Sequence, residues 1–302
     1  MNVRLAVKSY SLFLCVLVAA CSSPATETNP EESHKAEPVA DSILGERAGQ
    51  VRDDNGLKMK LVRCPPGKFT MGSPKSESGR LNDEDQVEVT LTKGFWVGNY
   101  EITQAEWKQV MATEPWKGND FTKEGDDFPA TFVNWEDAME FCRKLTLQER
   151  KGGRLAADWE YTLPTEAQWE YACRAGTSTR FSFGDDESKL SEFGWWGGMV
   201  GEGSAKSEQY PHRVGQKKPN PWGLHDMHGN LSEWCRDYYA EKLPGGRDPV
   251  VTKSASDRGS RGGGWGSDAS TCRSASRDGG LPGDRDENFG FRVALSSVQP
   301  AK

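Results

Sequence analysis

The chain has 302 residues, a formal net charge of −7, 11 Trp and 33 Gly. The acidic balance argues against nucleic acid and anionic lipid as partners. Charged residues make up 27% of the chain and the mean hydropathy is −0.74, so we expect a soluble protein whose core uses a few large aromatics among many turns. Long regular elements should be scarce.

The N-terminus has the features of a bacterial export signal. Arg4 and Lys8 precede an apolar run, residues 12–20, that ends in two alanines directly before Cys21. The run is shorter than the ~20 apolar residues of a membrane-spanning helix, so cleavage is expected. Residues 18–21 resemble a lipobox, which implies that Cys21 becomes lipidated and anchors the protein in the cell envelope, at the periplasmic side or the outer membrane. The alternative is an ordinary signal peptide with an incidental cysteine.

Composition divides the rest of the chain into a tether, a domain and a tail. Residues 21–57 are rich in Glu, Ser, Thr, Pro and Ala and read as a flexible tether from Cys21. Residues 58–297 suffice for one large domain, and residues 298–302 form a short tail. Removal of the signal, residues 1–20, takes away two basic residues and no acid, which leaves 36 basic and 45 acidic residues and a net charge of −9.

The first half of the domain carries the clearest signals for regular structure. Residues 59–71 predict a strand, a Pro-Pro-Gly turn and a second strand, and residues 87–97 alternate like a strand pair. Three segments begin with a residue whose side chain can cap a helix. These segments and their caps are 102–111 with Thr103, 134–145 with Asn134 and 165–175 with Thr165. Beyond Gly176 we expect turns, short strands and loops.

The loop at residues 219–234, PNPWGLHDMHGNLSEW, is the most informative segment. Gly229 and Asn230 tolerate left-handed backbone angles, and Asp226 and Glu233 supply the hard oxygen ligands that calcium prefers. The spacing is not that of an EF-hand. A glycine-rich loop with a few salt-bridging acids therefore remains an alternative.

Five cysteines remain after cleavage of Cys15 and lipidation of Cys21: Cys64, Cys142, Cys173, Cys235 and Cys272. In an oxidising compartment some of them should pair, and the odd number leaves at least one free thiol. Spacing does not reveal which ones pair. The chain has no C-x-x-C motif, and its four histidines do not form a convincing zinc set.

Seven motifs in order resemble the formylglycine-generating enzyme domain, also called the sulfatase-modifying factor domain. They are FTMGS (69–73), YEITQAEW (100–107), VNWEDAMEFC (133–142), LPTEAQWEYACRAG (163–176), the 219–234 loop, RGGGW (261–265) and GFRVA (290–294). The resemblance implies a single, irregular α+β domain related to C-type lectins, with short antiparallel strands, about three main helices and structural calcium. The type activity of this family uses copper and O₂ to oxidise a cysteine in an unfolded sulfatase segment to formylglycine.

The resemblance also assigns a calcium site. It implies that Asp226 and Glu233 contribute side-chain oxygens and that Gly229 and Leu231 contribute backbone carbonyls. Mixed carboxylate and carbonyl ligands suit a hard cation of flexible geometry.

The same resemblance argues against copper. Active members place two cysteines, with four residues between them, beyond the glycine-rich turn, whereas this chain has Ser267 and Cys272 at the corresponding positions. A hydroxyl is a poor ligand for Cu(I), which prefers thiolates. Cys272 can instead match a structural cysteine, which implies a disulfide with Cys173. Ser232 replaces a tryptophan of the active members and Gly264 replaces a serine, and both changes also disfavour oxidation.

Three functions follow from these observations. The first is a calcium-stabilised binding or assembly module that has lost the oxidase site. The second is a formylglycine-generating oxidase acting on exported sulfatases. The third is another chemistry in which Cys272, His225 or His228 binds a different metal.

A surviving groove should bind an extended peptide, such as an envelope protein or sulfatase-like segment, or a sulfated glycan. Its expected walls are Trp265, Arg261 and Arg273, joined by Trp195, Trp196 and Arg277. Arginines attract anionic ligands at contact range even on an acidic protein. The alternative is that these tryptophans are core residues and that the arginines bridge acids such as Asp278 and Glu287.

Overall fold

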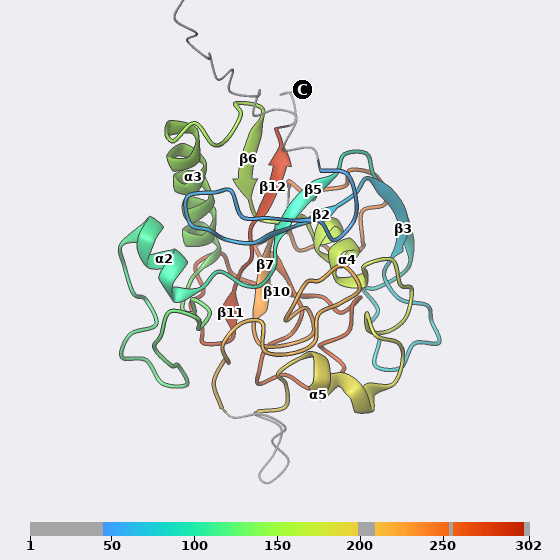
Figure 1. The fold of residues 1–302 in the computed structure, drawn as a ribbon. Coiled ribbons are helices and arrows are strands. Elements are labelled where there is room, and N and C mark those ends of the chain that lie inside the picture. Colours follow the sequence, from blue (N-terminus) through green and yellow to red (C-terminus); the bar gives the residue numbers. More distant parts are fainter. Residues whose placement is uncertain (1–44, 199–208, 254–255, 299–302) are drawn as a thin grey trace, which may run out of the picture. The chain divides into compact units, whose positions relative to one another are not determined.

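The structure is a computed structural model that describes residues 45–198, 209–253 and 256–298 (Figure 1). The expected signal, the lipidation site at Cys21 and most of the expected tether lie outside these residues. Within them, no helix combines the length and apolar character needed to cross a membrane.

The three expected helices form, and their caps are confirmed. They are α2 (Gln104–Met111), α3 (Trp135–Lys151) and α4 (Glu166–Arg174). The Thr103 and Thr165 side chains each complete a capping box, and the Asn134 side chain accepts from the third residue of α3. α3 extends beyond the expected end at residue 145, to Lys151. A short 3₁₀ turn, η1 (Glu187–Lys189), leads into α5 (Leu190–Phe193).

Twelve short strands form three sheets within the described residues (Figure 1). The five-stranded sheet has the order β1 (Val51–Arg52), β2 (Leu61–Cys64), β5 (Phe95–Gly98), β12 (Ala294–Ser297) and β6 (Trp159–Thr162). The four-stranded sheet has the order β10 (Asp278–Gly280), β9 (Arg258–Arg261), β7 (Ser232–Tyr238) and β11 (Phe289–Gly290). The three-stranded sheet has the order β3 (Gly67–Met71), β4 (Val87–Leu91) and β8 (Gly246–Arg247). The expected α+β class is confirmed.

Two sequence expectations about the start of the domain need correction. The strands expected in residues 59–71 form as β2 and β3, but residues 87–97 are not a strand pair. They form β4 and β5, and β4 pairs with β3 whereas β5 pairs with β2. The tether is shorter than predicted, since β1 lies within residues 21–57 and pairs with β2. Asn55 is also buried and holds the backbone of Met59. Backbone hydrogen bonds to the sheet order this segment despite its few apolar side chains.

Tryptophans dominate the core, as the composition predicts. Six are among the largest fully buried side chains: Trp96, Trp107, Trp116, Trp169, Trp234 and Trp265. Three buried arginines, Arg261, Arg273 and Arg292, accompany them. Because a buried charge is costly unless it is paired, the partners of these arginines decide what they do.

Candidate binding cavity and cation site

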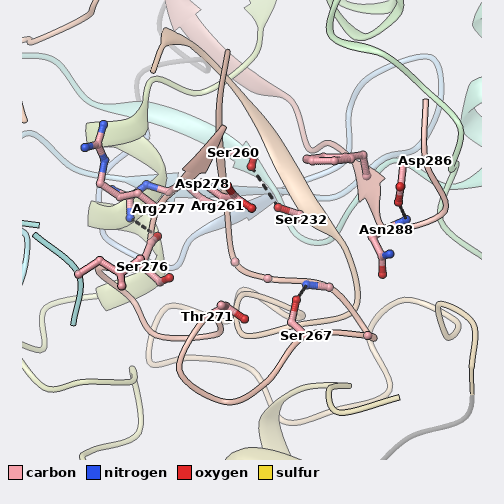
Figure 2. A pocket seen from close by; sticks show the side chains of 16 residues that line it. Ser232, Ser260, Arg261, Ser267, Thr271, Ser276, Arg277, Asp278, Asp286 and Asn288 are labelled. Atoms are coloured by element: carbon pink, nitrogen blue, oxygen red, sulfur yellow. Dashed lines mark hydrogen bonds between the residues drawn. The ribbon is translucent and has the colours of Figure 1, made fainter. Parts of the chain in front are cut away.

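A cavity of about 440 Å³ lies against the four-stranded sheet (Figure 2). Its volume is within the ~300–1,000 Å³ typical of ligand sites. Most of the lining residues are glycines or carry hydroxyl or amide groups. The hydroxyl-bearing residues are Ser232, Ser260, Ser267, Thr271 and Ser276. The cavity can therefore exchange many hydrogen bonds with a ligand.

The glycine-rich turn after β9 shapes one wall of the cavity. Gly262 and Gly263 have φ values of +96° and +66°, and a Cβ on Gly263 would lie 3.0 Å from the Cys272 sulfur. The amide of Gly264 donates to the Ser267 hydroxyl at 2.9 Å, which closes the turn. Side chains are excluded from this wall by backbone conformation as well as by space.

Asn288 is a lining residue that the sequence reasoning missed. Its backbone carbonyl accepts from the Ser232 backbone amide at 2.8 Å, and its backbone amide donates to the Asp286 carboxylate at 2.7 Å. The side-chain oxygen of Asn288 is buried and has no hydrogen-bond partner within the described structure. The signal that could have found it is its position directly before β11, at the edge of the GFRVA motif.

The arginines expected in the groove are neutralised by acids. Arg261 lines the cavity, but its guanidinium pairs with Glu170 at 2.7 Å and with Glu166 at 3.2 Å. Arg277 also lines the cavity and pairs with Glu166 at 2.7 Å. Figure 2 shows both side chains directed away from Ser232 and Ser260, toward α4. These arginines mainly join the sheet to α4.

The other expected groove residues do not line the cavity. Arg273 is fully buried and pairs with Glu84 at 2.6 Å and Glu77 at 2.7 Å. Trp265 is fully buried behind the glycine-rich turn, with Phe121 stacked at a ring distance of 6.0 Å. Trp195 and Trp196 are also absent from the described lining. The alternative of a core tryptophan and salt-bridged arginines therefore describes Trp265 and the arginines, although their partners are not the expected Asp278 and Glu287. Trp195 and Trp196 are half-buried.

The 219–234 loop adopts the strained backbone that its glycines suggested. Gly223, Asp226, Gly229 and Asn230 all have positive φ values. A Cβ on Gly229 would lie 2.2 Å from the Trp195 carbonyl oxygen, so two backbone segments touch at this point. The backbone amide of Asn230 stabilises this contact, because it donates to the same Trp195 carbonyl at 2.9 Å.

Three buried carboxylates, two of them in this loop, lie close enough to influence one another electrostatically. They belong to Asp226, Glu233 and Glu101, each at most 1% exposed. Arg292 donates to both oxygens of Glu233 at 2.6 Å, and the Trp169 indole donates to one of them at 2.8 Å. Burial raises the pKa of Asp226 to about 6. Burial, followed by the charges of Asp226 and Glu233, raises the pKa of Glu101.

Two of these carboxylates have oxygens that suit a cation. Asp226 accepts from the Gly215 amide with one oxygen, and Glu101 accepts from the Asn230 side chain with one oxygen. The second oxygen of each is buried and has no partner among the described residues. No described group of three or more His, Cys, Asp or Glu is arranged to hold a metal ion. Two buried, unpartnered carboxylate oxygens are the kind of hard ligand that calcium uses together with backbone carbonyls.

Comparison with known proteins identifies the family. The Sulfatase-modifying factor enzyme 1-like domain matches residues 49–297. The chain belongs to this family. The fold agrees, since PvdO from Pseudomonas aeruginosa has a TM-score of 0.70 at 27% identity, over 84% of this chain and 100% of that one.

The names of the relatives in the sulfatase-modifying factor family indicate different functions. Chaperone protein LppX of Paenibacillus barcinonensis is 27% identical over 84% of this chain and 96% of its own length. The formylglycine-generating enzyme of Streptomyces coelicolor is 32% identical, over 77% and 88%. The inactive C-alpha-formylglycine-generating enzyme 2 of Bos taurus is 24% identical, over 82% and 91%. Membership in the family is therefore compatible with catalytic and with inactive proteins.

The positions that correspond to the family's cysteine pair differ in their surroundings. Ser267 lines the cavity, whereas Cys272 is fully buried and no cysteine is among the described lining residues. Burial raises the pKa of the Cys272 thiol to about 12. This thiol is therefore neutral and inaccessible, and it does not fit the role of a copper ligand.

The expected disulfide between Cys173 and Cys272 is wrong. All five cysteines in the described part of the chain are free and buried. The His228 imidazole contacts both residues: Nε2 lies 3.8 Å from the Cys173 sulfur, and Nδ1 lies 2.9 Å from the Cys272 carbonyl oxygen. His228 thus has a packing role, and burial lowers its pKa to about 4.

Proposed function

We propose that this chain is a non-oxidising binding module of the bacterial envelope, whose cavity holds a segment of a partner protein. One observation carries this proposal. Where the family's oxidase would need two thiolates, the cavity offers the Ser267 hydroxyl and no cysteine among its described lining residues. Such a surface can bind a peptide by hydrogen bonds but lacks soft ligands for Cu(I).

The copper-dependent reaction is not supported by the residues present. Holding Cu(I) requires thiolate ligands, and the only cysteine at a corresponding position is the buried, neutral Cys272. Ser232 also removes the bulk of the family's tryptophan and opens the cavity. The names of two relatives, a chaperone and an inactive enzyme, support a role in binding without oxidation.

A structural calcium ion belongs to this proposal. Asp226 and Glu101 would hold it with their unpartnered oxygens, together with the carbonyls of Gly229 and Leu231 that the family resemblance names. Glu233, which the resemblance also names, would stay bound to Arg292, because both of its oxygens accept from that guanidinium. The ion would neutralise buried negative charge that Arg292 alone does not balance. Anchoring at the envelope through lipidated Cys21 completes the proposal and rests on the pattern of residues 18–21.

The first test separates binding from oxidation. The purified chain is incubated with Cu(I), O₂ and a peptide carrying a sulfatase cysteine motif, with the Streptomyces coelicolor enzyme as positive control. We expect no mass loss from conversion of the cysteine to an aldehyde. Turnover comparable to the control would refute the non-oxidising function.

A second test addresses the cavity directly. An unbiased array of 12-residue peptides is probed with the wild type and with Ser232→Trp, which refills the cavity with an indole. We expect the variant to lose the peptides that the wild type selects. Val51→Trp, at a position that is 53% exposed in β1, controls for the added indole. Equal selection by Ser232→Trp would place binding elsewhere.

A further inference from the structure

The cavity has little free positive charge, because its two arginines are already paired. Arg261 is held between Glu166 and Glu170, and Arg277 is bound to Glu166. The carbonyls of Ser274 and Ser276 also accept from Arg261. An anionic ligand would have to compete with these buried, charge-assisted contacts.

The charge that remains at the cavity is negative. Asp278 and Asp286 both line it, and neither has a basic partner at salt-bridge distance within the described structure. The segment 278–287 carries four acids and one base, Arg285, and therefore a net charge of −3. Arg285 itself pairs with Asp137 of α3, away from the lining residues. The cavity wall is thus acidic where it meets solvent.

Further hydrogen-bond acceptors line the cavity. The Asn288 side-chain oxygen is buried and lacks a donor, and Asp286 uses one oxygen for the Asn288 amide. The Ser232 and Ser260 hydroxyls, 3.2 Å apart, have further acceptor capacity. A ligand that satisfies this surface must supply several N–H or O–H donors.

Apolar contacts border the acidic wall. Leu81, which is 54% exposed, and Phe289 both line the cavity. Lysine and arginine combine an aliphatic stem, which packs on apolar surface, with a cationic head that has three or five donors. The aliphatic stem therefore suits the apolar lining residues, and the cationic head suits the acidic ones.

We propose that the cavity receives a lysine or arginine side chain from an extended segment of the partner protein. This inference rests on the proposed function and names the chemistry that the partner must present. It also replaces the expectation of a sulfated glycan, because sulfate groups would face Asp278 and Asp286. A neutral segment could use the hydroxyl groups but would leave the acidic wall without a counter-charge.

Fluorescence anisotropy with three labelled nonapeptides tests the inference. The peptides consist of Gly, Ser and Ala and differ only at the central residue, which is Arg, Gln or Glu. We expect the Arg peptide to bind at least tenfold more tightly than the Gln peptide, and the Glu peptide to bind most weakly. The preference should shrink at high salt, because Asp278 is exposed.

Two aspartate variants assign the effect to the cavity. Asp286→Asn keeps an acceptor for the Asn288 amide and removes the charge, so it should lose most of the preference for Arg over Gln. Asp158→Asn removes an exposed acid outside the cavity lining and should leave the preference unchanged.

The outcomes distinguish the two proposals. If all three peptides bind equally and Ser232→Trp abolishes their binding, the basic preference is overturned and the peptide-binding function stands. If none of the peptides binds, both proposals are overturned. A stronger affinity for the Glu peptide would overturn the charge argument.

Discussion

The backbone contact between Gly229 and Trp195 makes a sharp prediction about stability. A methyl group at Gly229 would stand 2.2 Å from the Trp195 carbonyl oxygen, on a residue with a φ of +126°. Gly223 lies in the same loop with a φ of +90°, but a Cβ there would meet nothing within 4 Å. Replacing each glycine by alanine therefore separates the cost of backbone conformation from the cost of the close contact.

The two costs can be estimated. Placing an L-residue at positive φ costs about 1–2 kcal/mol, which is the expected loss for Gly223→Ala. Gly229→Ala adds overpacking worth about 1–3 kcal/mol. It also disturbs the hydrogen bond from the Asn230 amide to the Trp195 carbonyl, worth roughly 1 kcal/mol. The total for Gly229→Ala is then about 3–6 kcal/mol, a large part of the ~5–15 kcal/mol that stabilises a typical domain.

Urea unfolding of the two variants and the wild type measures both costs. For a domain of this size, each kcal/mol lowers the melting temperature by roughly 2–4 °C, so thermal melts provide a second measurement. Gly229→Ala should lose at least twice as much stability as Gly223→Ala. Equal losses would refute the backbone contact as the reason for glycine at position 229.

Three further predictions concern the metal, the thiols and the anchor. Calcium chelation should lower the melting temperature by several degrees, because a ligand at 100 times its Kd adds about 2.7 kcal/mol of stability. Glu101→Gln should reduce this shift. An unchanged melting temperature after chelation would contradict calcium binding. Burial raises the pKa of Cys173 and Cys272 to about 12. Their thiolate fraction at pH 8 is therefore roughly three orders of magnitude below that of a free cysteine, so alkylation of these thiols should require unfolding of the protein. Cys21→Ser should release the protein from the membrane fraction, and continued retention there would contradict the lipid anchor.

Local signals in the sequence were sufficient for the helices. Thr103, Asn134 and Thr165 each cap a helix with contacts to residues three positions away. The positive φ values of Gly229 and Asn230 follow in the same way from residue type. These features depend on the residue itself and its immediate neighbours, so a single sequence can reveal them.

The functional surface depended on distant partners instead. Arg261 is separated from Glu170 by 91 residues, and Arg273 from Glu84 by 189. From sequence, both arginines could equally serve a ligand or a buried acid. Only the fold shows that both arginines pair with buried acids. The charge expected at the cavity was positive, and the charge that remains is negative. Asn288 was missed for a related reason, since its orphaned oxygen is a property of the packed structure.

Strand β7 connects the two parts of the candidate site. Successive residues of a strand face opposite sides, and here Ser232 lines the cavity while Glu233 reaches the buried carboxylates and Arg292. Glu233 is also aligned with Arg261 of β9 and with Gly290 of β11, so the same register that fixes the acidic cluster fixes the cavity. If a cation binds Asp226 and Glu101 as proposed, it would therefore also stabilise the strand that presents Ser232, and its removal should disturb the cavity as well as the 219–234 loop.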